Sequence, residues 1–176
     1  MVKYLIVGSV MLSNNLLANI SLNELDWLVI NDTVMGGVSN SRVVIGKEAL
    51  TFEGLLSLEN NGGFASFRAP ISLQNKAIKQ LQFTVKGDGK RYQLRLRVDE
   101  YIDGPAFVYS FQTEKDKSQT FDLTEQDFIL MYRGRQLRSE YQFKFKDVRA
   151  LGFMISNKQA GEFKLKVKTI SYFQSA

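Results

Sequence analysis

Glycine-rich turns, each followed at once by a strand-like run, constrain this chain more than any other feature. They occupy residues 31–39, 60–68 and 86–92 and read NDTVMGGVS, NNGGFASFR and KGDGKRY. Glycine reaches backbone angles with positive φ, and permits close backbone approach, where other residues are strained. Turns of this kind before successive strands predict an all-β scaffold with shaped loops.

Alternation of apolar and polar residues predicts the strands themselves. A period of two runs through residues 50–58, 80–86, 91–99, 106–111 and 163–168. Residues 150–155 form a continuous apolar run instead, which is typical of a central strand. No segment has a long helical period, although residues 123–131 could form one turn of helix. Many short strands joined by turns indicate a β-sandwich or jelly roll.

Length and composition limit the chemistry. A chain of 176 residues is one domain with a proper core, and no linker-like tract divides it. Cysteine and histidine are both absent, which excludes disulfides, cysteine nucleophiles, thiolate metal sites and a Ser-His-Asp triad. Catalysis would be left to carboxylate, Lys, Tyr, Ser or Arg chemistry, and a hard cation could still bind oxygen ligands.

The first 18 residues differ from the rest. Lys3 precedes an apolar run at residues 4–12, and Ala18 offers a small-residue cleavage position. This layout is typical of a secretory signal, so we expect a signal peptide over residues 1–18, a single sandwich domain over 19–176, and a periplasmic or secreted protein. The alternative is an apolar segment packed on the sandwich of a cytoplasmic or membrane-peripheral protein. The run is too short for a membrane-spanning helix, which takes about 20 apolar residues.

The formal net charge is +5 and the isoelectric point is about 9.4. This charge favours acidic partners, among them nucleic acid, anionic lipid and acidic protein surfaces. The simpler interpretation is a solvated basic surface, because the basic residues are spread along the chain. No recognised nucleic-acid motif occurs, so we expect no nucleic-acid partner.

The first glycine turn is a candidate binding loop. Asp32 and Ser39 supply side-chain oxygens, and Gly36 and Gly37 leave backbone N–H groups open to approach. Such a loop could hold a ligand, an ion or the backbone of a partner. The structural alternative is that Asp32 caps a turn, Met35 fills the edge of the core and the glycines meet backbone demands.

A basic strand is the second candidate. Gln93, Arg95 and Arg97 should project from one face, about 7 Å apart by strand geometry. On a concave face they would offer planar donors to carboxylate, phosphate or sugar hydroxyls. The alternative is an exposed face paired with carboxylates on neighbouring strands, such as Glu53.

Three further motifs have simpler explanations. Arg133 and Arg135, in a stretch with weak strand signal, predict a loop that is solvated or contacts an acidic group. Residues 87–89, Gly-Asp-Gly, lack the third glycine of a dinucleotide fingerprint and predict a hairpin turn. Lysines at positions 164, 166 and 168 predict an edge strand protected against aggregation.

The ordered set of motifs resembles one family. Its most specific part is Trp27 with the pattern DxVMGGxS at residues 32–39. The remaining motifs follow in order: FEG at 52–54, NGGFAS at 61–66, GDG at 87–89 with Tyr92, RGR at 133–135, LGF at 151–153 and GEF at 161–163. Over residues 24–173 the chain resembles the CIA30 family, named for a mitochondrial protein associated with assembly intermediates of respiratory complex I.

The resemblance implies a galactose-binding-domain-like β-sandwich that acts as a non-catalytic protein-binding module. Its role would be that of an assembly factor or chaperone for a membrane-associated, respiratory-type complex, and its partners would be proteins of that complex. No catalytic residue, cofactor or metal is carried over. We expect partner or ligand contacts from Trp27, Asp32, Met35, Gly36, Gly37, Ser39, Asn61, Arg68, Arg95, Arg97, Arg133 and Arg135.

Two other functions remain open on the sequence. An exported carbohydrate-binding module would need exposed aromatic platforms, for which Trp27, Tyr101, Tyr109 and Tyr132 are available. A glycoside hydrolase would need two carboxylates about 5–10 Å apart, such as Asp32 and Glu53.

Overall fold

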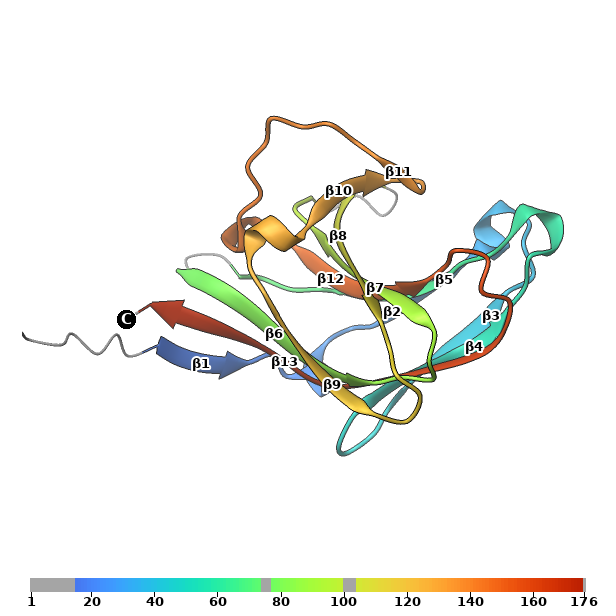
Figure 1. Ribbon diagram of the computed structural model, residues 1–176, viewed down its shortest axis with the longest axis horizontal. Coiled ribbons are helices and arrows are strands. Elements are labelled where there is room, and N and C mark those ends of the chain that lie inside the picture. Colours follow the sequence, from blue (N-terminus) through green and yellow to red (C-terminus); the bar gives the residue numbers. More distant parts are fainter. Residues whose placement is uncertain (1–14, 74–76, 100–103, 176) are drawn as a thin grey trace, which may run out of the picture.

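Two antiparallel sheets pack face to face across one hydrophobic core (Figure 1). The structure is a computed structural model that describes residues 15–73, 77–99 and 104–175. It confirms the all-β sandwich. Within those ranges the helical elements are five short 3-10 turns: η1 (Leu22–Glu24), η2 (Asp32–Met35), η3 (Glu59–Asn61), η4 (Glu125–Asp127) and η5 (Phe145–Asp147).

The first sheet has six strands. In spatial order they are β3 (Asn40–Ile45), β4 (Leu50–Leu56), β13 (Gly161–Ser175), β6 (Ile78–Lys86) and β9 (Ser118–Leu123), with β1 (Asn15–Asn19) also pairing with β13. The long strand β13 carries β4 beside its first half and β1 beside its second half. The predicted edge position of Lys164, Lys166 and Lys168 is therefore wrong, because β13 is central.

The second sheet has seven strands. Their order is β11 (Arg135–Gln136), β10 (Ile129–Tyr132), β8 (Ala106–Gln112), β7 (Arg91–Arg97), β12 (Ala150–Ile155), β5 (Ala65–Pro70) and β2 (Leu28–Asn31). β12 lies between β7 and β5, which confirms the central strand predicted from its continuous apolar run. The helical turn expected within residues 123–131 is limited to η4, because β10 begins at Ile129.

The Gly-Asp-Gly turn at residues 87–89 does not close a hairpin. It follows β6 in the first sheet and leads to β7 in the second, so the chain crosses between sheets here. The Asp88 carboxylate accepts hydrogen bonds from the Lys164 N–H at 2.8 Å and from the Tyr92 hydroxyl at 3.1 Å. The turn chemistry was evident locally, but the pairing partners of β6 and β7 were not.

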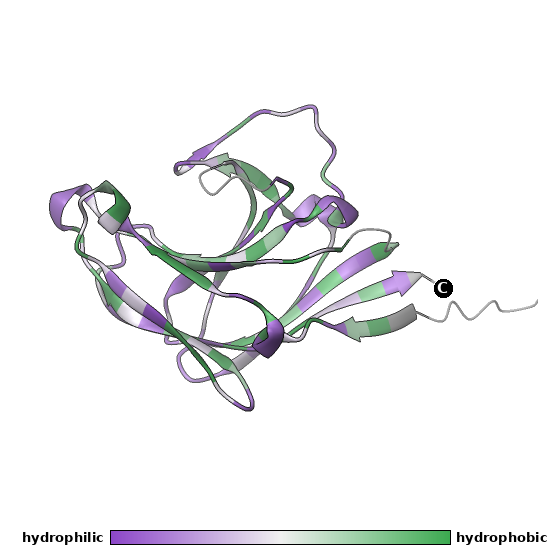
Figure 2. Cartoon of the chain, turned by 180° about the vertical axis from the view of Figure 1, so that it is seen from behind, coloured by the Kyte–Doolittle hydropathy of each residue, from purple (hydrophilic) through white to green (hydrophobic). Residues whose placement is uncertain are grey.

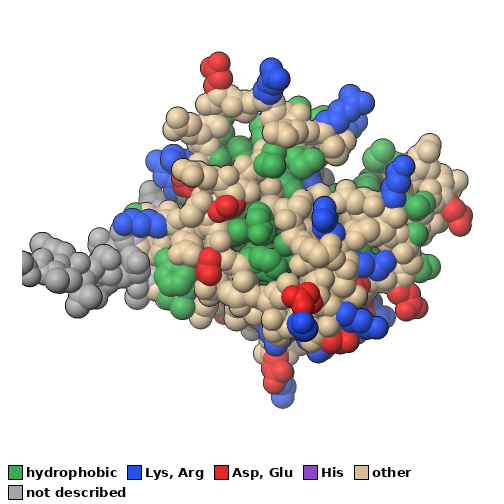
Figure 3. Space-filling model, viewed as in Figure 1, with side chains coloured by type: hydrophobic (Ala, Val, Ile, Leu, Met, Phe, Trp, Pro, Cys, Tyr) green, Lys and Arg blue, Asp and Glu red, His purple; other side chains and the backbone are tan. Residues whose placement is uncertain are grey.

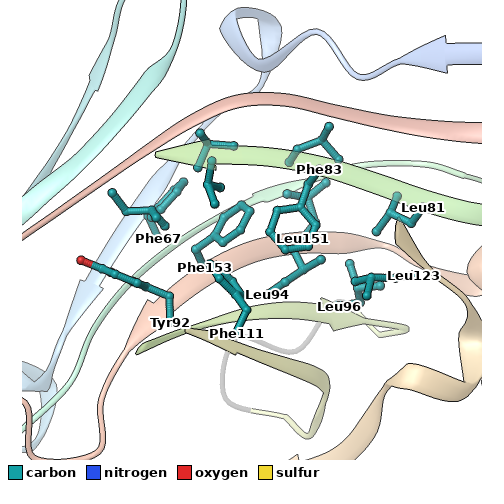
Figure 4. Packing of buried hydrophobic residues seen from close by; sticks show 14 of the residues in the cluster. Phe67, Leu81, Phe83, Tyr92, Leu94, Leu96, Phe111, Leu123, Leu151 and Phe153 are labelled. Carbon is teal, nitrogen blue, oxygen red and sulfur yellow. The ribbon is translucent and has the colours of Figure 1, made fainter. Parts of the chain in front are cut away.

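Aromatic rings fill the centre of the sandwich (Figure 4). Phe83 on β6 lies 5.1 Å from Phe111 on β8, centroid to centroid, and Phe67 on β5 lies 5.7 Å from Phe153 on β12. These contacts join the two sheets and the neighbouring strands within one sheet. Hydrophobic residues alternate with polar ones along most strands, as the hydropathy colouring of Figure 2 shows.

Leu58 and Trp27 both lie at the edge of this core. Leu58, the last residue of the alternation predicted over residues 50–58, is 42% exposed because β4 ends at Leu56. Trp27 packs on Phe67, with 5.0 Å between ring centroids, and its indole N–H donates to the Leu22 carbonyl oxygen at 2.7 Å. The tryptophan is therefore half-buried at the rim of the core.

The N-terminal end of the described chain is part of the first sheet. β1 runs antiparallel to β13, with Ala18 opposite Tyr172. The cleavage position expected after Ala18 falls within this strand, and residues 1–14 of the expected signal peptide lie outside the described residues. Among the residues with described structure, no helix has the length and apolar character that crossing a bilayer requires.

Candidate functional site

A buried carboxylate joins two loops at one end of the sandwich, at the upper right of Figure 1. Asp32, at the start of the β2–β3 loop, is 1% exposed. Its carboxylate accepts hydrogen bonds from the Ser39 hydroxyl and N–H, at 2.5 and 2.9 Å. It also accepts from the N–H groups of Gly63 and Phe64 in the β4–β5 loop, at 2.6 and 3.3 Å.

These hydrogen bonds determine the ionisation of Asp32. Burial by itself raises the pKa of the carboxyl group, but the donors at Gly63, Ser39 and Phe64 outweigh burial and lower it below its ordinary value. Asp32 is therefore a fixed anion whose oxygens are already engaged. A buried carboxylate with several N–H and O–H donors stabilises the loops that supply them.

The two glycine motifs fit around this carboxylate. A Cβ atom at Gly37 would lie 2.4 Å from Asp32 Cγ, and one at Gly62 would lie 2.6 Å from Asp32 Oδ2. Both positions therefore need glycine for space. The DxVMGGxS and NGGF motifs belong to one structural unit, which explains why both occur in the chain.

We call the β2–β3 loop (residues 32–39) and the β4–β5 loop (residues 57–64) the loop pair. Other residues of the loop pair face outward. Met35 is 68% exposed, so it does not fill the edge of the core. Gly36 has φ of +88° and ends η2 by donating its N–H to the Thr33 carbonyl oxygen. Asn61 is exposed and has φ of 59°. The structure thus brings Asp32, Gly37 and Ser39 together below an exposed surface.

Three arginines lie together on the outer face of the seven-stranded sheet. Gly152 on β12 pairs in register with Arg68 on β5 and with Arg95 on β7. Arg97 lies two residues further along the same face of β7. A small pocket of about 30 Å³ lies at Gly152, and Ser66 and Met154 help to line it. We call Arg68, Arg95 and Arg97 the arginine face.

The arginine face concentrates like charges. Burial, followed by the charges of Arg97 and Arg68, lowers the pKa of Arg95 to about 10. The Arg95 guanidinium donates to Gln93 Oε1 at 2.8 Å, and Gln93 is itself buried. Arg97 donates to the carbonyl oxygens of Gly104 and Pro105. The arginines stay charged at neutral pH, and their proximity favours an anion.

Glu53 does not face this arginine strand, so that predicted pairing is wrong. Glu53 lies on β4 in the other sheet, where it pairs with Arg42 at 2.6 Å and with Lys164 at 2.8 Å. Hydrogen bonds from Lys164 and Arg42 lower its pKa. The carboxylates of Glu53 and Asp32, which a hydrolase would need, each already have polar partners.

Arg133 and Arg135 form a third region. Arg133 and Gly134 form the exposed turn between β10 and β11, and Arg135 begins β11. β8 separates this hairpin from β7. The Arg133 guanidinium lies 5.2 Å from the centroid of the Tyr132 ring. The predicted site residues therefore fall into two groups, the loop pair and the arginine face, with this hairpin and Trp27 apart from both.

A groove that was not predicted from the sequence lies beside residues 137–144. It has a volume of about 520 Å³, and Ile129, Leu137 and Tyr141 line it with exposures of 47%, 36% and 48%. The aromatic alternation Tyr141, Phe143, Phe145 was a signal for it. The Tyr141 hydroxyl donates to Asp147 at 2.8 Å, and burial followed by this hydrogen bond raises its pKa to about 12.

Of the expected aromatic platforms, those that the structure describes are less accessible than Tyr141. Tyr109 and Tyr132 are half-buried, and Tyr101 lies outside the described residues. Charged side chains of both signs are interspersed over the face of the molecule seen in Figure 3. Within the described ranges, no group of three or more acidic side chains is placed to hold a metal ion.

Residues 18–167 match the family described as complex I intermediate-associated protein 30 (CIA30). The chain belongs to the CIA30 family. The match covers both the loop pair and the arginine face. A search of curated proteins gave no match.

Solved structures similar to this CIA30 domain include carbohydrate-binding modules. A family 11 module from Clostridium thermocellum, in complex with a β-1,3-1,4-mixed-linked tetrasaccharide, is 16% identical with a TM-score of 0.65, covering 90% of this chain and 96% of the module. A mutant form of the family 29 module CBM29-2 is 10% identical with a TM-score of 0.53, covering 90% of this chain and 89% of the module.

An agarase, AgWH50C, is 9% identical with a TM-score of 0.57, and the match covers 91% of this chain but 24% of the enzyme. At such identities these likenesses establish the β-sandwich fold alone. The ligands of these proteins therefore bear on the CIA30 domain only as hypotheses.

Proposed function

We propose that this CIA30 protein is a non-catalytic protein-binding module that holds an acidic segment of a subunit during assembly of a membrane-associated, respiratory-type complex. Family membership supports the assembly role. The observation that carries the proposal is the arginine face, where Arg68 and Arg95 meet across Gly152. Arg97, two residues further along β7, adds a third guanidinium group to this face, and guanidinium groups suit carboxylates.

The chemistry of this face suits a protein better than a neutral sugar. The side chains that project outward around the pocket include Ser66, Arg95 and Met154. The rings of Phe67 and Phe153, beside them in sequence, are buried in the core. A neutral sugar is usually held by an exposed aromatic ring, and the pocket at Gly152 has none among the described residues.

Affinity purification tests the proposal. The tagged full chain and its Arg95→Gln variant are expressed in the source organism, cross-linked mildly and analysed by mass spectrometry. We expect subunits of a membrane-associated complex with the wild type and at least tenfold less with the variant. Arg91→Gln is the matched control, because Arg91 is exposed at the start of the same strand. Recovery that is independent of Arg95 contradicts the proposal.

We also propose that the protein is exported, and the same preparation tests it. Sequencing the N-terminus of the purified protein reports processing. A chain that begins near Asn19 supports a periplasmic or secreted location. Such a chain would lack every residue of β1 (Asn15–Asn19) except Asn19, and with them most of the pairing to β13. A chain that retains Lys3 contradicts export through this signal.

A second candidate function is binding of carbohydrate at the groove beside residues 137–144. Tyr141 is 48% exposed, and Gln136 and Gln142 line the groove with it. A half-exposed aromatic ring beside amide groups is a common way to hold a sugar ring. Affinity electrophoresis in gels with mixed-linked β-glucan should show retardation that Tyr141→Ala abolishes. Unchanged mobility of the wild type in this gel, and an empty glycan array, would exclude this candidate.

A further inference from the structure

The loop pair carries two residues that its buried carboxylate does not need. Asp32, Gly37 and Ser39 account for the hydrogen bonds and the close packing. Val34 and Met35, in the same motif, are 71% and 68% exposed, the highest values among the large hydrophobic residues of the described chain. The motif therefore contains both a structural part and an exposed apolar part.

The exposed part extends over both loops. Val38 is 48% exposed and precedes Ser39, and Leu58, 42% exposed, has its Cδ2 atom 3.1 Å from where a Cβ at Gly63 would lie. We call Val34, Met35, Val38 and Leu58 the apolar apex. Figure 2 shows hydrophobic residues in this loop pair, at the far left. Exposed apolar residues that gather at one place mark interaction sites.

The apolar apex stands on a fixed base. Besides the hydrogen bonds to Asp32, the Ser57 N–H donates to Ser39 Oγ at 2.9 Å, which links the two loops a second time. Gly37 donates its N–H to the Asp32 carbonyl oxygen at 3.0 Å. A loop held in this way loses little conformational entropy when a partner covers its tip, so more of the contact energy appears as affinity.

The charges near the apex indicate which kind of partner covers it. The segments 32–39 and 57–63 contain two charged residues, the buried Asp32 and the exposed Glu59, and no Lys or Arg. Loops that insert into anionic bilayers combine apolar tips with basic flanks. The apex has the apolar tip with an acidic flank, which is complementary to an apolar pocket with a cationic rim.

We propose that the apolar apex docks into an apolar pocket of the partner protein, with Lys or Arg at the pocket rim facing Glu59. The inference rests on the proposed function to the extent that it requires a protein partner. It assigns that partner a second contact, on different loops from the arginine face. Val34 and Met35 enter the pocket, and Asp32 keeps them in place.

Site-specific photo-cross-linking identifies the occupant. A benzophenone amino acid replaces Met35 in the full chain, expressed in the source organism, and a matched chain carries it at Val44, which is 47% exposed on β3. We expect position 35, and not position 44, to cross-link the protein that co-purifies with the wild type. The cross-linked peptide should lie beside a basic segment of that protein.

Affinity for the purified partner then tests the contact. Val34→Ser with Met35→Ser should weaken binding about tenfold or more, because a few buried apolar side chains dominate most interfaces. Val44→Ser should leave affinity unchanged. Both variants should keep the unfolding temperature of the wild type, since the substituted side chains are exposed.

Each other outcome overturns the inference in a recognisable way. If Arg95→Gln abolishes binding and the apex variant does not, the apex inference fails and the proposed function stands. If no protein co-purifies, both fail. If the wild type floats with vesicles of phosphatidylcholine and phosphatidylglycerol, and the apex variant does not, the apex contacts a membrane instead.

Discussion

Asp32 and Arg95 are both charged side chains withdrawn from water, and the pKa of each is lowered, but the two shifts have opposite meanings. For Asp32, hydrogen bonds from Gly63 and Ser39 overcome burial and favour the charged form. For Arg95, burial and the neighbouring Arg97 disfavour the charged form. The first arrangement stabilises the fold, whereas the second costs stability.

The difference separates structural from functional polar groups. The loop pair surrounds its anion with donors from two segments, so nothing further is needed there. The arginine face places cations beside one another across Gly152, an arrangement that does not stabilise the folded state. Costly charge clusters concentrate at binding sites, so the arginine face is favoured as a contact surface.

The largest effect is expected from Asp32→Asn. The amide NH₂ group would replace one carboxylate oxygen. Either the Ser39 N–H or the N–H groups of Gly63 and Phe64 would then lose their acceptor. The free energy of unfolding, measured in urea, should fall by about 2–4 kcal/mol. Asp26→Asn is the control, because Asp26 is exposed. Equal stability of both variants would contradict a structural role for the buried carboxylate.

A smaller loss is expected from Gly37→Ala. The added methyl group would overlap the Asp32 carboxylate, so stability should fall by about 2 kcal/mol. Gly36→Ala separates crowding from backbone strain, since no atom lies within 4 Å of its Cβ position but its φ is +88°. That variant should lose about 1 kcal/mol. Thermal unfolding by circular dichroism measures both, and the reverse order would exclude crowding at Gly37.

The stability that Asp32 contributes should depend on pH. Because the pKa of Asp32 is lower in the folded state than in the unfolded chain, its contribution is complete above the ordinary value of 3.8 and is lost as pH falls through the lowered value. The stability difference between wild type and Asp32→Asn should therefore narrow in acid. Urea titrations at pH 7, 4 and 2.5 measure this. A stability difference that stays constant with pH would show that the pKa of Asp32 is the same in the folded and unfolded states.

The smallest change in stability, with the opposite sign, is expected from Arg95→Gln. Removing a buried charge that Arg97 and Arg68 repel should raise the free energy of unfolding by less than about 1 kcal/mol, because burial and repulsion are both relieved. Arg91→Gln, on the exposed end of β7, should change nothing measurable. A loss of more than about 1 kcal/mol for Arg95→Gln would place this arginine with Asp32, among the structural groups.

The sequence by itself determined the elements whose signals are local. Period-two alternation predicted β6, β7 and β8 nearly to the residue, and the continuous apolar run predicted β12 as a central strand. Glycine pairs located the loops, and the ordered motifs identified the family. Strands with weak alternation, such as β2 and β10, were not recognised, because each has four residues and half-buried side chains.

Only the tertiary structure decided which strands are neighbours. β6 and β7 follow one another in sequence and lie in different sheets, and β13 is central despite its lysines. Alternation determines which face of a strand is buried, but pairing depends on contacts between distant segments. For the same reason, the hydrogen bond between Asp32 and Gly63 could not be predicted from the sequence. The two residues are 31 positions apart, and only folding brings them together.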